Sequence, residues 1–290
     1  MRFAHLVSDH SPEPRLAVID GGTALFTDEL LPAGPRLLQD LLDGGTGLDS
    51  LRAAVSAAGP EARRPLEGLG YAASVLRPPA LIAVGLNYSE HASELKLDER
   101  HEPVTFNLLP SSLSGHGQTT SWRASLSSEV DYECELGVVI GTAARDVTPE
   151  EALEHVFGYT VVNDITARDL QFAEPQWGRC KSFDGFTPAG PVVVTADEIP
   201  DPQDIRLKTV VDGLTVQDAS TSTMILTVAE LVSFLSTSTT LEPGTLIITG
   251  SPGGAGRSRT PQLFLTDGTV VTVSADRIGE LTTHCAILAG

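Results

Sequence analysis

Two glutamates stand two residues apart at the head of an apolar run, Glu133 and Glu135 within residues 131–141. In a β-strand, residues i and i+2 point to the same face, so we expect the two carboxylates side by side. The apolar residues 138–140 continue both faces of this strand, which predicts that both are buried. Buried like charges need a compensating cation, and a hard divalent metal ion is the simplest one.

A third carboxylate, Asp164, follows inside a second apolar segment, residues 161–166. Three oxygen ligands on rigid strands suit an octahedral Mg²⁺ or Mn²⁺ and leave positions open for substrate and water. The alternative is that Glu133 and Glu135 lie on a solvated strand face, since Glu is seldom buried without a partner. The second apolar strand favours a metal site formed by Glu133, Glu135 and Asp164.

His91 and Glu94 lie in residues 87–96, which read as a short helix after a strand end. At positions i and i+3 they share a face, so the carboxylate can orient the imidazole and raise its basicity. The alternative is an ordinary polar surface helix. Their place after a strand and near the candidate metal favours a catalytic pair.

Residues 167–186 mix fixed charges, amides and aromatic rings. Arg168, Arg179 and Lys181 are candidates for neutralising a substrate carboxylate or an enolate in a site that carries three acids. The alternative for at least one of them is a structural ion pair, such as Arg168 with Asp169.

A glycine-rich turn, residues 249–256, follows another apolar strand. It lacks the Lys-Ser/Thr of a P-loop and the helix of a dinucleotide fold, so we interpret it as a loop whose backbone amides, with Thr249 and Gly250 at its start, approach a ligand. The serine-rich segment 111–117 lacks the Gly-x-Ser-x-Gly elbow of a serine nucleophile.

The elements around these residues indicate a mostly β, α+β fold. Residues 1–75 predict a small α+β domain with strands near 3–7, 15–19 and 24–27 and a helical region over 37–58. After the linker at 77–79, residues 80–290 are dominated by short strands and predict a mixed β-roll or sandwich. Capping boxes start two helices, at Thr148 and Thr227, the first of which is expected to run to Gly158. The other expected strands are 80–85, 159–162, 191–195, 207–211, 245–249, 270–273 and 281–287.

The composition limits the partners. The 290 residues carry a formal net charge of −19, which argues against nucleic-acid or anionic-membrane binding because either would be repelled. Three cysteines without metal or disulfide spacing favour free thiols, and no apolar run reaches membrane-spanning or signal-peptide character. We expect a cytoplasmic enzyme for a small molecule.

Together, these motifs resemble the fumarylacetoacetate hydrolase family. The similarity covers roughly residues 80–285 and runs through Asn-Tyr-x-x-His-x-x-Glu, Pro-Ser-Ser-Leu-Ser-Gly, Asp-Tyr-Glu-x-Glu-Leu, Asn-Asp-x-Thr-Ala-Arg-Asp-Leu-Gln, Gln-Trp-x-Arg-x-Lys-Ser-Phe-Asp and Thr-Gly-x-Pro. It implies a mixed β-roll, a homodimer and Mg²⁺ or Mn²⁺ on two Glu and one Asp. It also implies a His/Glu pair on a lid, here His91 and Glu94, and substrate contacts from Gln171, Lys181 and Thr249.

The resemblance implies hydrolysis of a carbon–carbon bond in a 1,3-dicarbonyl acid such as an acylpyruvate, with His91 activating water and Lys181 as charge partner or proton donor. One alternative is decarboxylation or tautomerisation of a 2-oxo diacid at the same site, and another is a ligand-binding relative without turnover. The chain departs from the common family pattern at Leu108, His116 and Cys180, and we expect these positions to bear on substrate choice.

Overall fold

The computed structural model describes residues 1–8, 11–44, 46–90 and 102–289. One large sheet of 12 strands runs through it, in the order β4-β3-β2-β1-β14-β12-β11-β17-β6-β7, with β5 on β1 and β8 on β14. Its pairs are mostly antiparallel, but β17 runs parallel to β6 and β14 runs parallel to β8. The strands are β1 (Arg2–Ser8), β2 (Ser11–Asp20), β3 (Thr23–Phe26), β4 (Arg64–Pro65), β5 (Gly70–Tyr71), β6 (Leu81–Gly85), β7 (Val104–Asn107), β8 (Leu113–Ser114), β11 (Cys134–Ile140), β12 (Val156–Asn163), β14 (Thr187–Thr195) and β17 (Leu246–Ile248).

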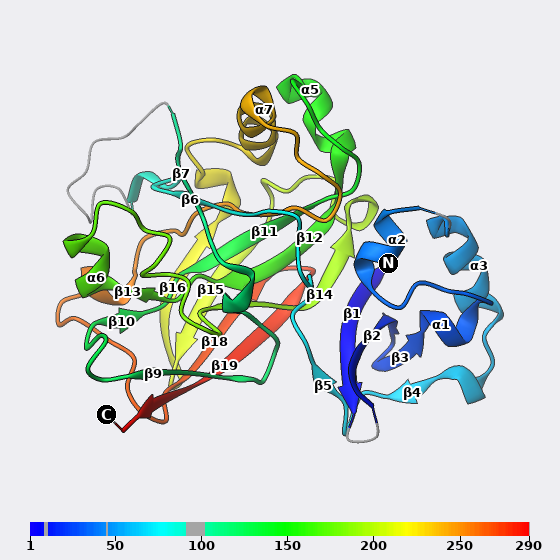
Figure 1. Cartoon of the computed structure of the whole chain (residues 1–290), viewed down its shortest axis with the longest axis horizontal. Helices are drawn as coiled ribbons and strands as arrows, with labels where there is room; N and C mark the ends of the chain where they lie inside the picture. The colour runs from blue at the N-terminus through cyan, green and yellow to red at the C-terminus, as the bar shows by residue number, and fades with distance from the viewer. Residues whose placement is uncertain (9–10, 45, 91–101, 290) are drawn as a thin grey trace.

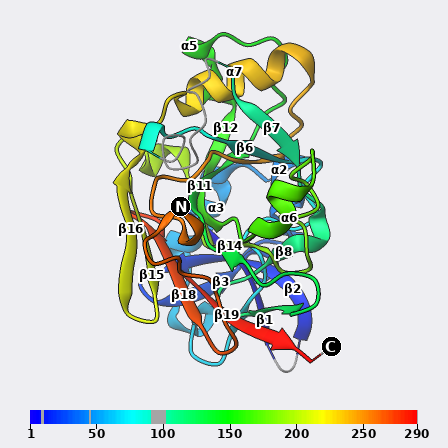
Figure 2. The same ribbon diagram turned by 90° about the vertical axis from the view of Figure 1, so that its left-hand side faces the viewer.

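A second sheet of five strands packs against the central strands of the first, as Figure 2 shows from the side. Its order is β16 (Leu214–Ser220), β15 (Arg206–Val211), β18 (Val270–Ala275), β19 (Gly279–Leu288) and β9 (Thr119–Arg123). The main hydrophobic cluster lies between the two sheets, and a second cluster covers the opposite face of β11 and β12. Every residue of β11 is therefore buried, and the predicted mixed β-roll is confirmed.

The helices are short and lie outside the sheets. They are α1 (Thr27–Leu30), α2 (Leu38–Leu42), α3 (Leu48–Ala57), α5 (Pro149–Ala152), α6 (Arg168–Ala173) and α7 (Val228–Ser238). Both predicted capping boxes are present, at Thr148 and Thr227. The predicted extent of the first helix is wrong: α5 ends at Ala152, and Val156 already begins β12, because residues 156–163 pair with β11.

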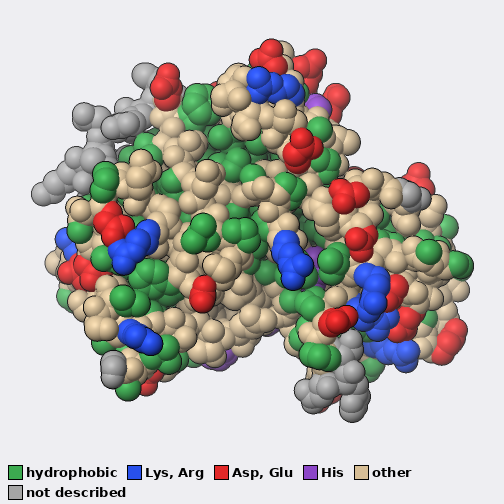
Figure 3. Space-filling view, viewed as in Figure 1, with side chains coloured by type: hydrophobic (Ala, Val, Ile, Leu, Met, Phe, Trp, Pro, Cys, Tyr) green, Lys and Arg blue, Asp and Glu red, His purple; other side chains and the backbone are tan. Residues whose placement is uncertain are grey.

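The first 75 residues extend the large sheet (Figure 1): Arg2 and Phe3 of β1 pair with Val194 and Val193 of β14. Whether they form a separate domain stays a prediction. On the face in Figure 3, basic side chains are scattered and several stand beside acidic ones. Within the described ranges, the three cysteines are reduced and buried, and none of the helices is long and apolar enough to cross a membrane.

Candidate metal centre

The pairing of β11 with β12 brings the three predicted metal ligands together. Cys134 lies opposite Asn163 in this ladder, so Glu133 at the start of one strand meets Asp164 at the end of the other, and the Asp164 amide donates to the Glu133 carbonyl at 2.9 Å. Glu135 lies one step further along β11. Carboxylate oxygens of Glu133, Glu135 and Asp164 lie within 4.8 Å of one another, and all three residues are buried.

Lys181 places its ammonium between two of these acids. The Nζ donates to Glu133 Oε2 at 2.7 Å, to Asp164 Oδ2 at 2.6 Å and to Thr166 Oγ1 at 2.8 Å. An ammonium has three hydrogens, so these three acceptors use all of them. Burial disfavours the charged amine, but contact with Asp164 and Glu133 outweighs it and raises the pKa of Lys181 above its ordinary value. The lysine is charged and fully engaged by protein acceptors.

Arg168 lies behind the cluster, at the start of α6. Its Nε donates to Asp131 at 2.6 Å, its Nη2 to Glu133 Oε1 at 2.6 Å and its Nη1 to Gln171 at 2.9 Å. The side chain has no solvent exposure. The guanidinium fork thus fixes Glu133 from the side opposite Lys181, and Asp131 is held in turn by the Arg257 amide at 2.8 Å. This is the structural ion pair that the sequence offered as the alternative for Arg168, although the partners are Asp131 and Glu133 rather than Asp169.

The glycine-rich turn reaches the third acid through its backbone. The Gly250 amide donates to Glu135 Oε2, and Gly250 has φ +97°, where a Cβ would lie 2.7 Å from Cβ of Asn87. The Asn87 side chain clamps this turn by donating to the Thr249 carbonyl at 2.9 Å. The Thr249 hydroxyl donates to the Leu136 carbonyl at 2.9 Å, so in this structure Thr249 fastens the turn to β11.

The cluster contains more acids than cations. Four buried carboxylates, Asp131, Glu133, Glu135 and Asp164, face two buried cations, Arg168 and Lys181, so the fully ionised cluster has an excess of two negative charges. Burial, reinforced by the neighbouring acids, raises the pKa of Glu135 well above its ordinary value and that of Asp164 to about 6.

One further observation indicates how this excess is balanced. Within the described ranges, Asp164 Oδ1 is buried and has no hydrogen-bond partner. An oxygen of this kind and a charge excess of two are what a divalent cation would satisfy. The residues present therefore fit Mg²⁺ or Mn²⁺.

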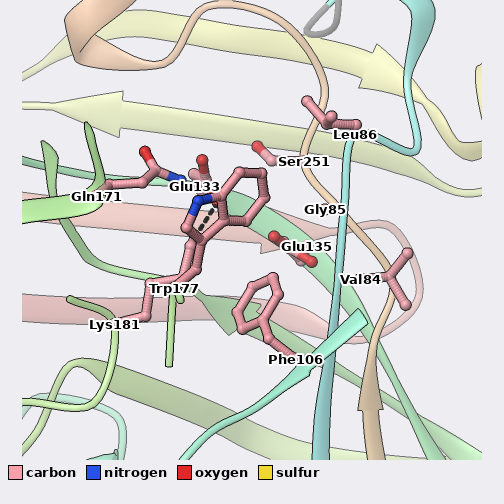
Figure 4. A pocket seen from close by; sticks show the side chains of 10 residues that line it. All are labelled: Val84, Gly85, Leu86, Phe106, Glu133, Glu135, Gln171, Trp177, Lys181 and Ser251. Atoms are coloured by element: carbon pink, nitrogen blue, oxygen red, sulfur yellow. Dashed lines mark hydrogen bonds and ion pairs between the residues drawn. The ribbon is translucent and has the colours of Figure 1, made fainter. Parts of the chain in front are cut away.

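A small cavity opens at the cluster (Figure 4). Its lining residues are Val84, Gly85, Leu86, Phe106, Glu133, Glu135, Gln171, Trp177, Lys181 and Ser251. The centre of a water molecule has about 10 Å³ to occupy there, which is room for one water or one ion. Two of the acids, Lys181, Gln171 and Ser251 form the polar part of the lining, and aromatic and aliphatic residues form the rest.

Some of the other residues predicted from the sequence line this cavity, and others do not. Gln171 lines it, whereas Arg179 pairs with Glu174 and is 59% exposed. Leu108 and His116 are not among its lining residues, and the His116 ring packs edge-on against Tyr71. The Cys180 thiol donates to the Trp177 carbonyl at 3.0 Å. The predicted catalytic pair, His91 and Glu94, lies outside the described residues.

Several contributors were not foreseen from the sequence. Asp131 anchors Arg168, and the Tyr88 hydroxyl is buried, its pKa raised by burial and by the charge of Glu135. Trp177 and Phe106 form the aromatic wall, with ring centroids 5.6 Å apart. The available signal was Trp177 itself, one of two tryptophans in the chain, four residues before the cluster lysine.

The comparisons with known proteins concern the family and the fold. The family model "Fumarylacetoacetate (FAA) hydrolase C-terminal" matches residues 80–286. The chain is 34% identical over 286 residues to the mitochondrial oxaloacetate tautomerase fahd2 of Xenopus laevis, covering 97% of this chain and 89% of that protein. Fumarylacetoacetate hydrolase from Exiguobacterium antarcticum superposes with a TM-score of 0.86 at 36% identity, covering 99% of this chain and 100% of the other.

A third similar structure holds ligands. Maleylpyruvate hydrolase from Sphingobium sp. SYK-6, in complex with manganese(II) and pyruvate, has a TM-score of 0.81 and 28% identity over the full length of both chains. The matched motifs, the shared fold and the buried acids lead to one conclusion: the chain belongs to the fumarylacetoacetate hydrolase family.

Proposed function

We propose that the protein is a divalent-metal-dependent hydrolase that cleaves a carbon–carbon bond in a 1,3-dicarbonyl acid of the acylpyruvate or fumarylacetoacetate type. The observation that carries the proposal is the buried acid cluster, which has an excess of two negative charges when ionised, at a small cavity with a polar and an apolar part. Glu133, Glu135 and Asp164 would hold Mg²⁺ or Mn²⁺. When bound, such an ion supplies Lewis acidity toward the oxygens of a 2-oxo acid.

The remaining roles fall to the chain's own residues. Lys181 holds Glu133 and Asp164 in place through one hydrogen bond to each and brings a positive charge to both, and its third hydrogen bond goes to Thr166. A role for Lys181 as proton donor would require one of these bonds to break first. His91, oriented by Glu94, is proposed to take a proton from the attacking water. The bond between C3 and C4 then breaks, C4 leaves as a carboxylic acid, and a proton added to C3 completes the 2-oxo acid product.

Tautomerisation of a 2-oxo diacid is the second candidate, and the relationship to the Xenopus oxaloacetate tautomerase over nearly the whole chain favours it. It needs the same stabilisation of an enolate and no activated water. Tautomerisation only moves a proton between C3 and the C2 oxygen, whereas cleavage adds water to C4 and breaks the bond between C3 and C4, so the two candidates differ in whether water attacks C4.

The deciding experiment measures both reactions on one metal-loaded preparation. Acetylpyruvate cleavage is followed by pyruvate release in a coupled assay, and oxaloacetate enol–ketone exchange by ultraviolet absorbance. We expect metal-dependent cleavage that Glu135→Gln abolishes, since this variant removes one charge from the proposed ligand set. Accelerated enol exchange without cleavage would replace the hydrolase proposal with the tautomerase. Activity on neither acid would favour a ligand-binding relative.

The His91→Ala variant distinguishes reactions that need an activated water from those that do not. If His91 activates water, this variant loses cleavage of acetylpyruvate and keeps any decarboxylation of oxaloacetate. Cleavage that survives in His91→Ala would refute the assignment of the catalytic pair.

A further inference from the structure

The cavity at the acid cluster has a defined mouth. Of its lining residues, Glu133, Glu135, Lys181, Gln171 and Ser251 are buried, as are Val84 and Phe106. Gly85, Leu86 and Trp177 are the three described lining residues with partial solvent exposure. The space at the acids takes one water or one ion, so a molecule that binds such an ion extends away from it past Trp177 and the Gly85–Leu86 segment.

The Trp177 ring is held at the cavity mouth by its packing against neighbouring residues. A Cβ on Gly85 would lie 2.5 Å from Trp177 Cζ3, so the indole packs where only glycine leaves room. Phe106 meets it edge-on at 72°, an arrangement that aromatic pairs prefer. In Figure 4 the indole lies across the cavity, with Leu86 and Val84 on the far side. The mouth is thus a slot between a fixed aromatic ring and aliphatic side chains.

The described lining offers no spare positive charge for a second carboxylate. Lys181 is its one cation, and its three hydrogens already meet Glu133, Asp164 and Thr166. Arg179 is outside the lining and pairs with Glu174. A charged tail in this slot would lose hydration without gaining an ion pair, which is unfavourable.

We infer that Trp177 and Leu86 form the subsite for the variable end of the substrate, and that this end is apolar or a flat conjugated enol rather than a second carboxylate. The inference rests on the proposed function, because it takes the 2-oxo acid end to lie at the acid cluster. It assigns substrate selection to the Trp177 wall. The departures at Leu108 and His116 lie outside this lining.

Three stable 2-oxo acids test the inference by calorimetry on the Mg²⁺-loaded protein. Pyruvate carries the shared end alone, 4-methyl-2-oxopentanoate adds an apolar tail, and 2-oxoglutarate adds an acidic tail of similar length. We expect 4-methyl-2-oxopentanoate to bind roughly tenfold more tightly than pyruvate, given the apolar carbons buried, and 2-oxoglutarate to bind no more tightly than pyruvate. Trp177→Leu should shrink the tenfold ratio to about threefold or less, because aromatic contacts are worth about that difference.

Fluorescence gives a readout that needs no turnover. The chain has two tryptophans, and Trp122 is buried against Phe186 outside the cavity. In Trp122→Phe, Trp177 is the reporter, and 4-methyl-2-oxopentanoate should shift its emission; in Trp177→Phe the same titration should leave the Trp122 emission unchanged. Gly85→Ala displaces the indole without removing it, so it should also reduce the tenfold ratio of the affinities for 4-methyl-2-oxopentanoate and pyruvate. This variant replaces Trp177→Leu in the test if Trp177→Leu does not fold.

The possible results distinguish a failure of the proposed subsite from a failure of the proposed function. If pyruvate binds only with metal but 2-oxoglutarate binds as tightly as 4-methyl-2-oxopentanoate, the subsite is refuted and the proposed function stands. An unchanged ratio in folded Trp177→Leu or Gly85→Ala also refutes the subsite. If pyruvate shows no metal-dependent binding, the proposed function is refuted and the subsite with it.

Discussion

Replacing Arg168 by methionine separates two roles for this residue. The sequence marked Arg168 as a candidate substrate ligand, whereas the structure holds it without solvent exposure between Asp131 and Glu133, each 2.6 Å away. Met fills a similar volume but carries no charge and no donor. The variant therefore leaves two buried carboxylates without their shared counter-charge.

The magnitude follows from that geometry. Breaking a buried ion pair by removing one partner costs about 3–5 kcal/mol. At about 2 °C per kcal/mol for a chain of this size, the melting temperature should fall by about 6–10 °C. Arg168→Lys keeps the charge, but a lysine ammonium cannot reproduce the fork that contacts Asp131, Glu133 and Gln171 together. We expect it to recover only part of the loss.

The assay is calorimetric unfolding at neutral pH without added metal, with Arg179→Met as matched control. Arg179 makes its ion pair with Glu174 at the surface, where such pairs contribute about 0–1 kcal/mol, so this control should shift the melting temperature by about 2 °C or less. The contrary result is that Arg168→Met lowers the melting temperature no more than the control does and raises KM for a 2-oxo acid. That result would make Arg168 a substrate ligand and refute its role in holding Asp131 and Glu133.

Three further predictions concern metal, pH and assembly. Mg²⁺ or Mn²⁺ at 100 times its Kd should raise the free energy of unfolding by about 2.7 kcal/mol; a thermal-shift titration in which wild type and Asp164→Asn respond alike would contradict the proposed site. His5 bridges the Ala73 carbonyl and the Leu38 amide, and burial lowers its pKa to about 4. Because the unfolded chain protonates His5 near pH 6.5, stability should fall as pH drops from about 6.5 to about 4, by at most about 3 kcal/mol. Urea unfolding at both pH values should show less of this loss in His5→Gln, and an equal loss would exclude His5 as its source. The family resemblance predicts a homodimer, so light scattering should give twice the 30.6 kDa of one chain, and a monomer mass would contradict it.

Local sequence signals predicted helices and strands well where a single local interaction, such as helix capping or the burial of an apolar run, decided the structure. The capping boxes at Thr148 and Thr227 start helices, and the apolar run after Glu135 is a strand buried on both faces. The end of α5 was mispredicted because Val156 and Phe157 fit a helical face as well as a strand. Pairing with β11 decides in favour of the strand, and this partner is distant in sequence.

The site was predictable to the level of residue types and no further. Spacing placed Glu133 and Glu135 on one face, but the register that sets Cys134 opposite Asn163, and so brings Asp164 to Glu133, is a tertiary property. The same limit applies to Lys181 and Arg168. The sequence made both candidates for neutralising a substrate charge, with a structural ion pair as the alternative, and only the folded chain shows that their hydrogens meet Glu133, Asp164 and Asp131.

These contacts also explain why Lys181 cannot take the place of a metal ion. Its single charge and three hydrogens are used on Glu133, Asp164 and Thr166, while Glu135 receives one backbone hydrogen bond, from Gly250. The uncompensated charge thus lies at Glu135 and at Asp164 Oδ1. A second cation is needed there to keep both acids ionised, since burial otherwise raises the pKa of each. The two fixed cations hold the acids in place but leave two negative charges, which is the charge that a divalent ion would neutralise.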